Sequence, residues 1–272
     1  MPVTVLLPDA PGNRRQGRFR AYAALCAVGM SFQVKEIFRS IQGEGVQAGK
    51  VAVFCRFSSC NLWSGQESDR AAARCGLCDT DFTGTDGQGG GTYDTAVLTA
   101  AILAAFGEQQ PEEVFDDPIF NAMATAKSGL IWNGMGLMAA PYVPHVVFTG
   151  GEPALQLHAD LIRSLRAYRL ELAVETNGTL ALPDGLDWVT VSPKAGAEIV
   201  IRTGQELKLL WPQPGIDPAS YITLPFEHFV LQPLDSGDPK RNAANIRLAA
   251  EYCLAHPKWR FGAQAHKLAG FK

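Results

Sequence analysis

From residue 32 onward, short β-branched and aromatic runs alternate with longer stretches in which apolar residues recur every three or four positions. The first pattern predicts buried strands and the second predicts amphipathic helices. Helices are expected at 95–106, behind an N-cap at Asp94, and at 155–168 and 242–254. Strands are expected at 34–38, 51–57, 145–148, 171–175, 188–191, 206–211, 228–231 and 259–264. This alternation indicates an α/β fold with a mostly parallel sheet and right-handed crossovers, closed as a full or partial barrel.

Polar and glycine-rich motifs follow several of these strands at their carboxyl ends. They are Thr149-Gly150-Gly151-Glu152-Pro153, Glu175-Thr176-Asn177-Gly178, Ser192-Pro193-Lys194, Gln232-Pro233-Leu234-Asp235 and Gln264-Ala265-His266-Lys267. Each motif alone is compatible with an ordinary turn, because Gly, Pro, Asn and Asp are the common turn residues. Active sites of barrels and open α/β sheets lie at the carboxyl ends of the strands. The five motifs are therefore predicted to meet at one active site.

The remaining parts of the chain carry weaker patterns. Residues 1–30 are predicted to be a disordered extension or an upstream start, because pattern and motifs begin only at Ser31. Residues 31–272 are predicted to form the folded domain, with a long insertion at about 84–144 to which no chemistry is assigned. Residues 128–151 lack charged side chains, but glycines and prolines interrupt them, so no membrane span is predicted.

Composition narrows the classes of protein. The 272 residues include 24 Lys and Arg against 27 Asp and Glu, a formal net charge of −3. This balance disfavours a nucleic-acid-binding protein, which needs a basic excess or stripe. With 47% hydrophobic and 19% charged residues a folded core is expected, and six cysteines are too few for a small secreted disulfide scaffold.

Three cysteines have a spacing suited to a metal site or cluster. Cys60, Cys75 and Cys78 follow the expected strand 51–57 as Cys-x14-Cys-x2-Cys, so two thiolates can face one centre and a third can join them. The open fourth position suits a catalytic water on zinc or a chelator on one iron of a [4Fe-4S] cluster. Cys55 shares a strand face with Val53 and Phe57 and is expected to pack as a small hydrophobe. Unrelated free thiols remain the alternative at this point.

The order of these motifs indicates a family. Gln42-Gly43-Glu44-Gly45, Arg56, the cysteine loop ending in Cys78-Asp79-Thr80, and the strand-end motifs follow one another in a way that closely resembles the 7-carboxy-7-deazaguanine synthases. These are radical S-adenosylmethionine (SAM) enzymes of queuosine and 7-deazapurine biosynthesis. The resemblance runs from about Ser31 to Lys272, without most of the insertion. The general radical SAM signature is Cys-x3-Cys-x2-Cys, and the longer first gap matches a subset of this family with a lengthened cluster loop.

The resemblance implies a partial (β/α) barrel of the radical SAM type that binds a [4Fe-4S] cluster and SAM, with Mg2+ at the substrate. Cys60, Cys75 and Cys78 would hold a [4Fe-4S] cluster whose fourth iron is chelated by SAM, and SAM cleavage would give a radical that is later quenched to regenerate SAM. The implied SAM-binding residues are Leu77, Cys78, Asp79, Gly151, Glu175, Ser192, Pro193, Lys194, Gln232, Pro233, Leu234 and Asp235.

The resemblance also implies a reaction and partners. 6-Carboxy-5,6,7,8-tetrahydropterin would lose hydrogen from C6, contract its ring and release ammonia to give 7-carboxy-7-deazaguanine. The implied substrate-binding residues are Ile41, Gln42, Gly43, Glu44, Arg56, Thr149, His266 and Lys272, with Thr80 as a ligand of Mg2+. A flavodoxin-like or other electron donor, a homodimer and, because the cluster needs a reducing compartment, the cytoplasm are expected, without nucleic acid or membrane.

Two other classes stay open. A glycyl-radical activase would also be a radical SAM enzyme, but such activases often carry additional cluster cysteines, and here the other cysteines, Cys26, Cys55 and Cys253, are scattered. A zinc-binding structural or RNA-interacting module would need a closed site of four metal ligands and a basic face. This chain has three clear ligands and a net negative charge.

Overall fold

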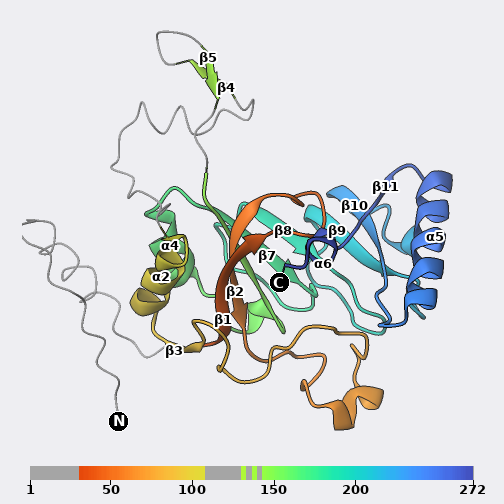
Figure 1. Cartoon of the computed structure of the whole chain (residues 1–272), viewed down its shortest axis with the longest axis horizontal. Helices are drawn as coiled ribbons and strands as arrows, with labels where there is room; N and C mark the ends of the chain where they lie inside the picture. Colours follow the sequence, from red (N-terminus) through yellow and green to blue (C-terminus); the bar gives the residue numbers. More distant parts are fainter. Residues whose placement is uncertain (1–30, 108–129, 133–136, 140–142, 272) are drawn as a thin grey trace, which may run out of the picture.

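The computed structural model describes residues 31–107, 130–132, 137–139 and 143–271. Within these residues the chain forms a sheet of nine strands in the order β11-β10-β9-β8-β7-β6-β2-β1-β3 (Figure 1). The strands are β1 (Phe32–Ile41), β2 (Val51–Phe57), β3 (Gly91–Tyr93), β6 (His145–Gly150), β7 (Glu171–Thr176), β8 (Trp188–Val191), β9 (Gly204–Trp211), β10 (Phe226–Pro233) and β11 (Trp259–Phe261). A separate hairpin consists of β4 (Leu130–Trp132) and β5 (Leu137–Ala139).

The sheet is mostly parallel and open. From β2 through β6 to β11 all neighbouring strands pair in parallel, whereas β1 pairs antiparallel with both β2 and β3. The edge strands β3 and β11 do not pair with each other among the described residues. The predicted α/β fold with a partial barrel is therefore confirmed.

Helices cover the convex face of the sheet. They are α2 (Thr95–Ala104), α4 (Ala159–Arg166) and α5 (Pro239–Ala255), while α6 (Ala265–Ala269) lies near the C-terminal end of the chain. The core under α2 and α4 contains Leu98, Ile102 and Leu161 together with strand residues such as Val53 and Cys55. Cys55 is fully buried there, as the alternation of β2 predicted.

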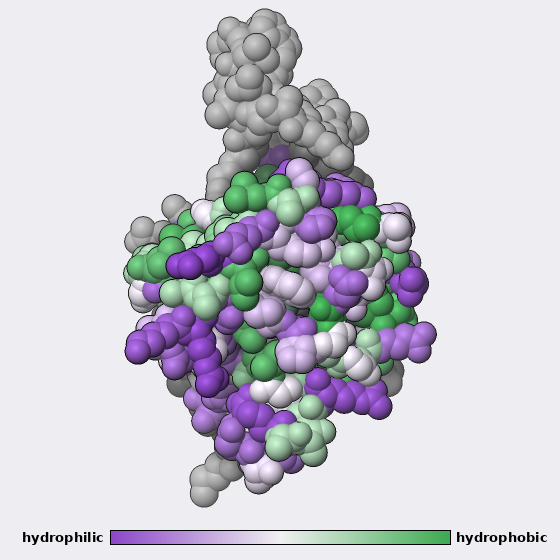
Figure 2. Space-filling model, turned by 90° about the vertical axis from the view of Figure 1, so that its right-hand side faces the viewer, coloured by the Kyte–Doolittle hydropathy of each residue, from purple (hydrophilic) through white to green (hydrophobic). Residues whose placement is uncertain are grey.

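Helix α5 packs over the other end of the sheet and buries little of its own surface. Ala249 is fully buried against β9 and β10, whereas Ile246, Leu248 and Leu254 are exposed. Figure 2 looks onto the side of the molecule that carries α5 and shows hydrophobic and hydrophilic residues interspersed over it.

The concave face of the sheet changes from apolar to polar along the strands. Ala52, Val147 and Ala173 form an apolar floor with Phe54 and Trp188. Two residues further along, the same faces carry polar side chains, because successive residues on one face of a strand are two positions apart. Arg56 pairs in register with Thr149, and Thr190 pairs with both Glu175 and Glu206. This polar layer lies toward the carboxyl ends of the strands, where the motifs were predicted to meet.

The expected elements are largely observed, with differences at their ends. The side chain of Asp94 accepts a hydrogen bond from the Val97 amide at 2.8 Å, which confirms the predicted N-cap of α2. The helix expected at 155–168 begins only at Ala159, because Pro153–Leu155 forms a separate 3-10 turn, η3. The strand expected at 259–264 ends at Phe261, and the chain then turns into α6.

The described first part of the predicted insertion is integrated into the fold. Residues 91–93 extend the sheet as β3, and Leu98, Ile102 and Phe106 are buried in the core. Residues 108–129, 133–136 and 140–142 lie outside the described residues, as do residues 1–30, and the division of the chain into an extension and a domain with an insertion stays a prediction. In the described part of the chain, no helix is both long and apolar enough to cross a membrane.

Candidate active site

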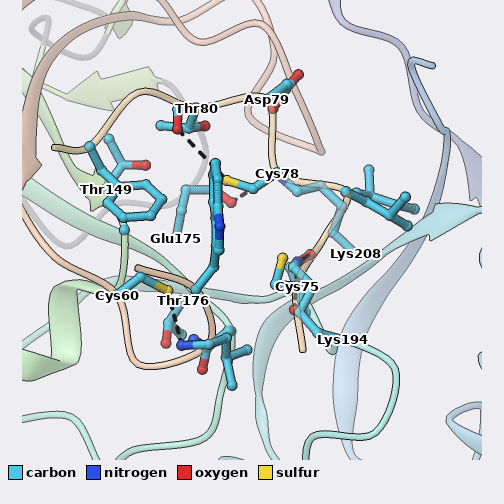
Figure 3. A pocket seen from close by; sticks show the side chains of 18 of the residues that line it. Cys60, Cys75, Cys78, Asp79, Thr80, Thr149, Glu175, Thr176, Lys194 and Lys208 are labelled. Atoms are coloured by element: carbon cyan, nitrogen blue, oxygen red, sulfur yellow. Dashed lines mark hydrogen bonds and ion pairs between the residues drawn. The ribbon is translucent and has the colours of Figure 1, made fainter. Parts of the chain in front are cut away.

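A pocket lies over the carboxyl ends of the strands and collects most of the predicted site residues. Its lining includes Glu44, Cys60, Cys75, Leu77, Cys78, Asp79, Thr80, Thr149, Gly151, Glu175, Ser192, Lys194, Gln232, Leu234 and Asp235. Figure 3 shows the cysteine side chains around one space, with Thr149, Glu175, Lys194 and Lys208 beside it. Leu62, Trp63, Phe82 and Leu210 supply apolar parts of the wall.

The three cysteine thiols border this pocket from one loop, which runs from the end of β2 to residue 82. A hydrogen bond between the Cys75 and Cys78 side chains lowers the pKa of Cys78 and raises that of Cys75. Burial raises the pKa of Cys60. Burial also lowers the pKa of Lys194, whose charge favours the thiolate forms of Cys75 and Cys78.

Cysteine thiolates can bind either a single zinc ion or an iron–sulfur cluster. A tetrahedral zinc with zinc–sulfur bonds of about 2.3 Å needs sulfur atoms within about 4 Å of one another. Among the residues that the structure describes, no group of three or more His, Cys, Asp or Glu side chains is arranged to hold one metal ion. Soft thiolates are also the usual protein ligands of iron–sulfur clusters, which distribute their ligands over several irons.

Glycine is required where β6 meets the cysteine loop. A Cβ on Gly151 would lie 2.0 Å from the Ser59 carbonyl oxygen and 2.9 Å from the Cys60 Cβ. The Glu152 amide, next in the chain, donates to the same Ser59 carbonyl at 2.9 Å. Any larger residue at position 151 would push the first cysteine away from the end of β6.

Carboxylates surround the buried side chain of Lys208, a residue that no sequence motif indicated. Its ammonium group donates to Glu44 Oε2 at 2.7 Å and to Glu175 Oε2 at 2.8 Å. Gln264 donates to the other oxygen of Glu44 at 2.8 Å, and Gln42 donates to Glu175 Oε1 at 3.3 Å. The signal in the sequence was the pair of charged residues two apart, 206 and 208, in an otherwise apolar strand.

The two carboxylates on Lys208 differ in pKa. Burial would raise the pKa of Glu44, but the charge and hydrogen bond of Lys208, with further hydrogen bonds from Gln264 and Gln232, lower it to about 2. For Glu175, burial together with the nearby charges of Glu206 and Glu44 outweighs Lys208 and raises the pKa to about 7. One carboxylate is therefore firmly ionised, while the other exchanges a proton near neutral pH.

A further carboxylate, fully buried, fixes the loop after β7. Glu152 accepts hydrogen bonds from the Thr176 hydroxyl at 2.6 Å and from the Asn177 amide at 2.8 Å. Burial raises its pKa despite these bonds. On the neighbouring strand end, the Lys194 ammonium donates to the Ser192 hydroxyl at 2.7 Å. These hydrogen bonds hold the predicted strand-end motifs in place.

Some predicted site residues lie beside the pocket rather than in its lining. Arg56 Nε donates to Glu36 Oε1 at 2.9 Å, next to Thr149 on the concave face. Gly43 packs against the C-terminal helix, because a Cβ there would lie 2.0 Å from His266 Nδ1 and its carbonyl accepts from the Ala265 amide at 2.8 Å. Gln42 reaches the site through its bond to Glu175. Ile41, Pro193 and Pro233 do not line the pocket, and Lys272 lies outside the described residues.

An open α/β sheet that carries three cysteine thiols and glycine-rich strand ends at its carboxyl edge is the arrangement of the radical SAM enzymes. Comparison with known proteins identifies the family within this class. The chain is 51% identical over 243 residues to the 7-carboxy-7-deazaguanine synthase of Nitratidesulfovibrio vulgaris, covering 89% of this chain and 99% of that protein. It is 47% identical over 242 residues to the synthase of Bordetella pertussis, again covering 89% and 99%. The chain belongs to the 7-carboxy-7-deazaguanine synthase family.

A solved structure supports the fold independently. The crystal structure of QueE from Escherichia coli matches with a TM-score of 0.57 over 88% of this chain and 96% of that chain. Its sequence identity of 23% makes it a guide to the fold alone. A scan against family models finds no match.

Proposed function

We propose that this protein converts 6-carboxy-5,6,7,8-tetrahydropterin to 7-carboxy-7-deazaguanine with release of ammonia, as a radical SAM lyase of queuosine biosynthesis. The observation that carries the proposal is the meeting of Cys60, Cys75 and Cys78 with the strand-end motifs on one pocket. Near full-length relatives of this name at 51% and 47% identity support it. When bound, a [4Fe-4S] cluster and SAM supply the one-electron chemistry that removes a hydrogen atom from the substrate.

The strand ends are proposed to hold SAM. Ser192 and Lys194 present a hydroxyl and a partly buried ammonium group beside the cysteines, and Gln232, Leu234 and Asp235 line the adjoining wall. We assign Leu77, Cys78, Asp79, Gly151, Glu175, Pro193 and Pro233 to the same surface. The apolar side chains of Leu62, Trp63 and Phe82 keep water from this part of the pocket, which a reactive carbon radical requires.

The carboxylate network is proposed to recognise the pterin. Ionised Glu44 accepts hydrogen bonds, whereas Glu175 accepts or donates one according to its protonation, and a pterin edge offers both donors and acceptors. Thr149 lies beside them in the pocket lining. The remaining proposed contacts come from Ile41, Gln42, Gly43, His266 and Lys272.

Arg56 is proposed to bind the substrate carboxylate. In the structure its Nε–H is used by Glu36. A guanidinium carries five N–H donors in a planar fork, so Arg56 can keep this bond and still face a second carboxylate. Glu36 thereby orients Arg56 for the substrate.

The hydroxyl of Thr80 is suited to Mg2+. Thr80 lines the pocket next to the last cysteine, and Mg2+ commonly keeps several waters and takes oxygen ligands from a substrate. We propose that Thr80 holds Mg2+ together with the bound substrate. A homodimer, a flavodoxin-like or other electron donor and a cytoplasmic location complete the proposal.

The proposed function is tested by anaerobic reconstitution with iron and sulfide. The reconstituted protein is incubated with reductant, SAM, Mg2+ and 6-carboxytetrahydropterin, and products are followed by mass spectrometry. We expect 7-carboxy-7-deazaguanine from the wild type and from Cys253→Ala, whose thiol lies on α5 away from the pocket, but none from Cys60→Ala.

The other outcomes separate the alternatives. A cluster spectrum with 5′-deoxyadenosine but no deazaguanine would keep the radical SAM class and reject the substrate. Tight binding of one zinc ion per chain, without cluster formation, would instead favour the zinc-binding module.

A further inference from the structure

The long spacer between Cys60 and Cys75 is folded around one arginine. The spacer contains a 3-10 helix, η1 (Glu67–Ala72), with Arg70 in its last turn. The proposed function gives roles to the two cysteines that bound this spacer and to Leu62 and Trp63 at its start, but none to residues 64–74.

Arg70 contacts three separate parts of the loop. Its guanidinium lies over the Trp63 ring at 4.0 Å from the ring centre. Its Nε donates to the two carboxylate oxygens of Glu67 at 2.9 and 2.7 Å. One terminal nitrogen, NH1, donates to the carbonyl oxygens of Gly76 and Cys78, each at 3.0 Å. One side chain thus ties the start of the spacer to the Cys75–Cys78 turn.

The platform beneath Arg70 is itself anchored. Trp63 is 7% exposed, its Nε1 donates to the Gln66 carbonyl at 3.1 Å, and its ring meets Phe82 edge-on at 5.6 Å. The Cys75 amide donates to the Leu62 carbonyl at 3.4 Å, directly before this tryptophan. Because Trp63 is fixed in place and Arg70 stacks on it, the bonds from Arg70 hold the turn that carries Cys75 and Cys78 in a fixed position.

The two bonds to carbonyl groups also orient amide groups. In a trans peptide the C=O and N–H point in opposite directions, so the N–H groups of Leu77 and Asp79 point away from Arg70. Arg70 and Gly76 line an outer groove, whereas Leu77, Cys78 and Asp79 line both this groove and the cysteine pocket. The turn is the wall between the two, and the side opposite Arg70 is the pocket side.

We propose that Arg70 is a positioning residue that holds the Cys75–Cys78 turn ready for cluster binding before any metal arrives and directs the Leu77 and Asp79 amides toward the cluster side. The cluster part of this inference rests on the proposed function. N–H groups near cluster sulfurs raise the reduction potential, so Arg70 also helps to set how easily the cluster is reduced. Lysine cannot replace it fully, because an ammonium group lacks the planar face that stacks on Trp63.

The test compares Arg70→Gln and Arg70→Lys with Arg74→Gln, an exposed arginine on the same loop beside Cys75. Hydrogen–deuterium exchange of the metal-free proteins over residues 60–80 is measured first. Iron per chain after reconstitution with limiting iron and sulfide, and the midpoint potential of the cluster by electron paramagnetic resonance titration, follow.

We expect Arg70→Gln to exchange about tenfold faster than wild type over the Cys75–Cys78 turn, the factor that corresponds to losing one hydrogen bond from a charged group. Its iron uptake is expected to fall and the potential of the residual cluster to become more negative. Arg70→Lys should lie between Arg70→Gln and wild type, and Arg74→Gln should match wild type.

Unchanged exchange, iron uptake and potential in Arg70→Gln would overturn the inference. Equal effects of Arg70→Gln and Arg74→Gln would also overturn it, because loop charge rather than position would then be responsible. The hydrogen–deuterium exchange measurement needs no cluster. It therefore tests whether Arg70 orders the metal-free loop even if the wild type takes up no iron. A wild type that binds the cluster, responds to the Arg70 substitutions as expected and forms no deazaguanine would reject the proposed function alone.

Discussion

Three carboxylates, Glu44, Glu175 and Glu206, act electrostatically on the buried Lys208 ammonium, and one positive charge cannot neutralise all of them. The side chain of Glu206 accepts from the Val46 amide at 2.9 Å, but its Oε1 is buried without a hydrogen-bond partner. Burying an unpaired charge is costly, so the cluster favours taking up a proton. Glu175 is the member whose pKa rises into the neutral range, which makes it the residue that couples this site to pH.

Glu175→Gln should change how stability depends on pH. A carboxyl with a pKa of about 7 in the folded state and an ordinary value of 4.5 binds more protons folded than unfolded between these values. The wild type therefore loses stability as pH rises through this window, by about 3 kcal/mol in total, and the loss is constant above it. The variant cannot show this loss. In urea unfolding between about pH 5 and about pH 8, the free energy of unfolding of the variant relative to that of the wild type should increase as pH rises.

The control for this pH experiment is Glu198→Gln, an exposed carboxylate on the loop after β8. Its stability relative to the wild type should stay level over the same range. A parallel pH profile for wild type and Glu175→Gln would contradict the raised pKa.

Lys208→Met tests the ion pairs from the other side. Removing the ammonium leaves the largely buried carboxylates of Glu44 and Glu175 without their shared cation, and breaking a buried ion pair typically costs about 3–5 kcal/mol. We expect a loss near the lower end, because both carboxylates keep some exposure. Adding Glu175→Gln to Lys208→Met should recover part of the loss, and Lys240→Met in the exposed first turn of α5 should be neutral in urea unfolding. A Lys208→Met protein as stable as the Lys240→Met protein would refute this account.

At the scale of elements, the C-terminal helix α6 ties together segments that are distant in the chain. Lys267 Nζ lies 2.9 Å from Asp79 Oδ2 in the cysteine loop and 2.6 Å from Asp235 Oδ2 after β10. Gln264 and Ala265 bind the 42–44 segment from the same stretch. The short helix therefore fastens three loops of the pocket to one another.

Lys267→Met should loosen this stretch without unfolding the protein. Partly exposed ion pairs contribute about 0–1 kcal/mol each, so the unfolding temperature should hardly change. Hydrogen exchange over residues 262–271 should accelerate, and KM for the pterin should rise several-fold with a smaller change in kcat. Lys258→Met, which removes a lysine that donates to the Ile222 carbonyl, serves as the matched control. Unaltered exchange over 262–271 would show that the ion pairs do not hold the helix.

At the scale of the whole molecule, the pocket draws its lining from most of the sheet. The ends of β6, β7, β8, β9 and β10 all contribute, together with the cysteine loop and the start of the C-terminal stretch. A ligand that touches all of these segments is bound by the folded state and not by the unfolded chain. Ligand binding should therefore stabilise the molecule as a unit.

SAM should raise the unfolding temperature of the reconstituted protein. At a concentration of about 100 Kd a ligand specific for the folded state adds about 2.7 kcal/mol. For a chain of this size that corresponds to a rise of about 5–10 °C. Differential scanning calorimetry under anaerobic conditions measures the rise, and Cys60→Ala should lose most of it. An equal rise in Cys60→Ala would place the ligand away from the cysteines.

Much of this site was predictable because its signals are local. The Cys-x2-Cys pair, the glycines after β6 and the polar strand ends each stand within a few residues of one another. Lys208 and the Arg56–Glu36 pair were not predicted. Glu36 meets Arg56 because β1 runs antiparallel beside β2, and Lys208 matters because loop 42–44 and β7 bring Glu44 and Glu175 to it.

The sequence by itself determined the elements, the N-cap at Asp94, the burial of Cys55 and the edge of the sheet at which chemistry gathers. These follow from residue spacing, which is fixed along the chain and sets which face a side chain takes. Only the tertiary structure decided which strands adjoin, that α6 packs on residue 43 and that three carboxylates share the environment of Lys208. Such contacts join residues far apart in the chain, 220 positions in the bond from Gln264 to Glu44, and depend on strand order and burial that no local pattern encodes.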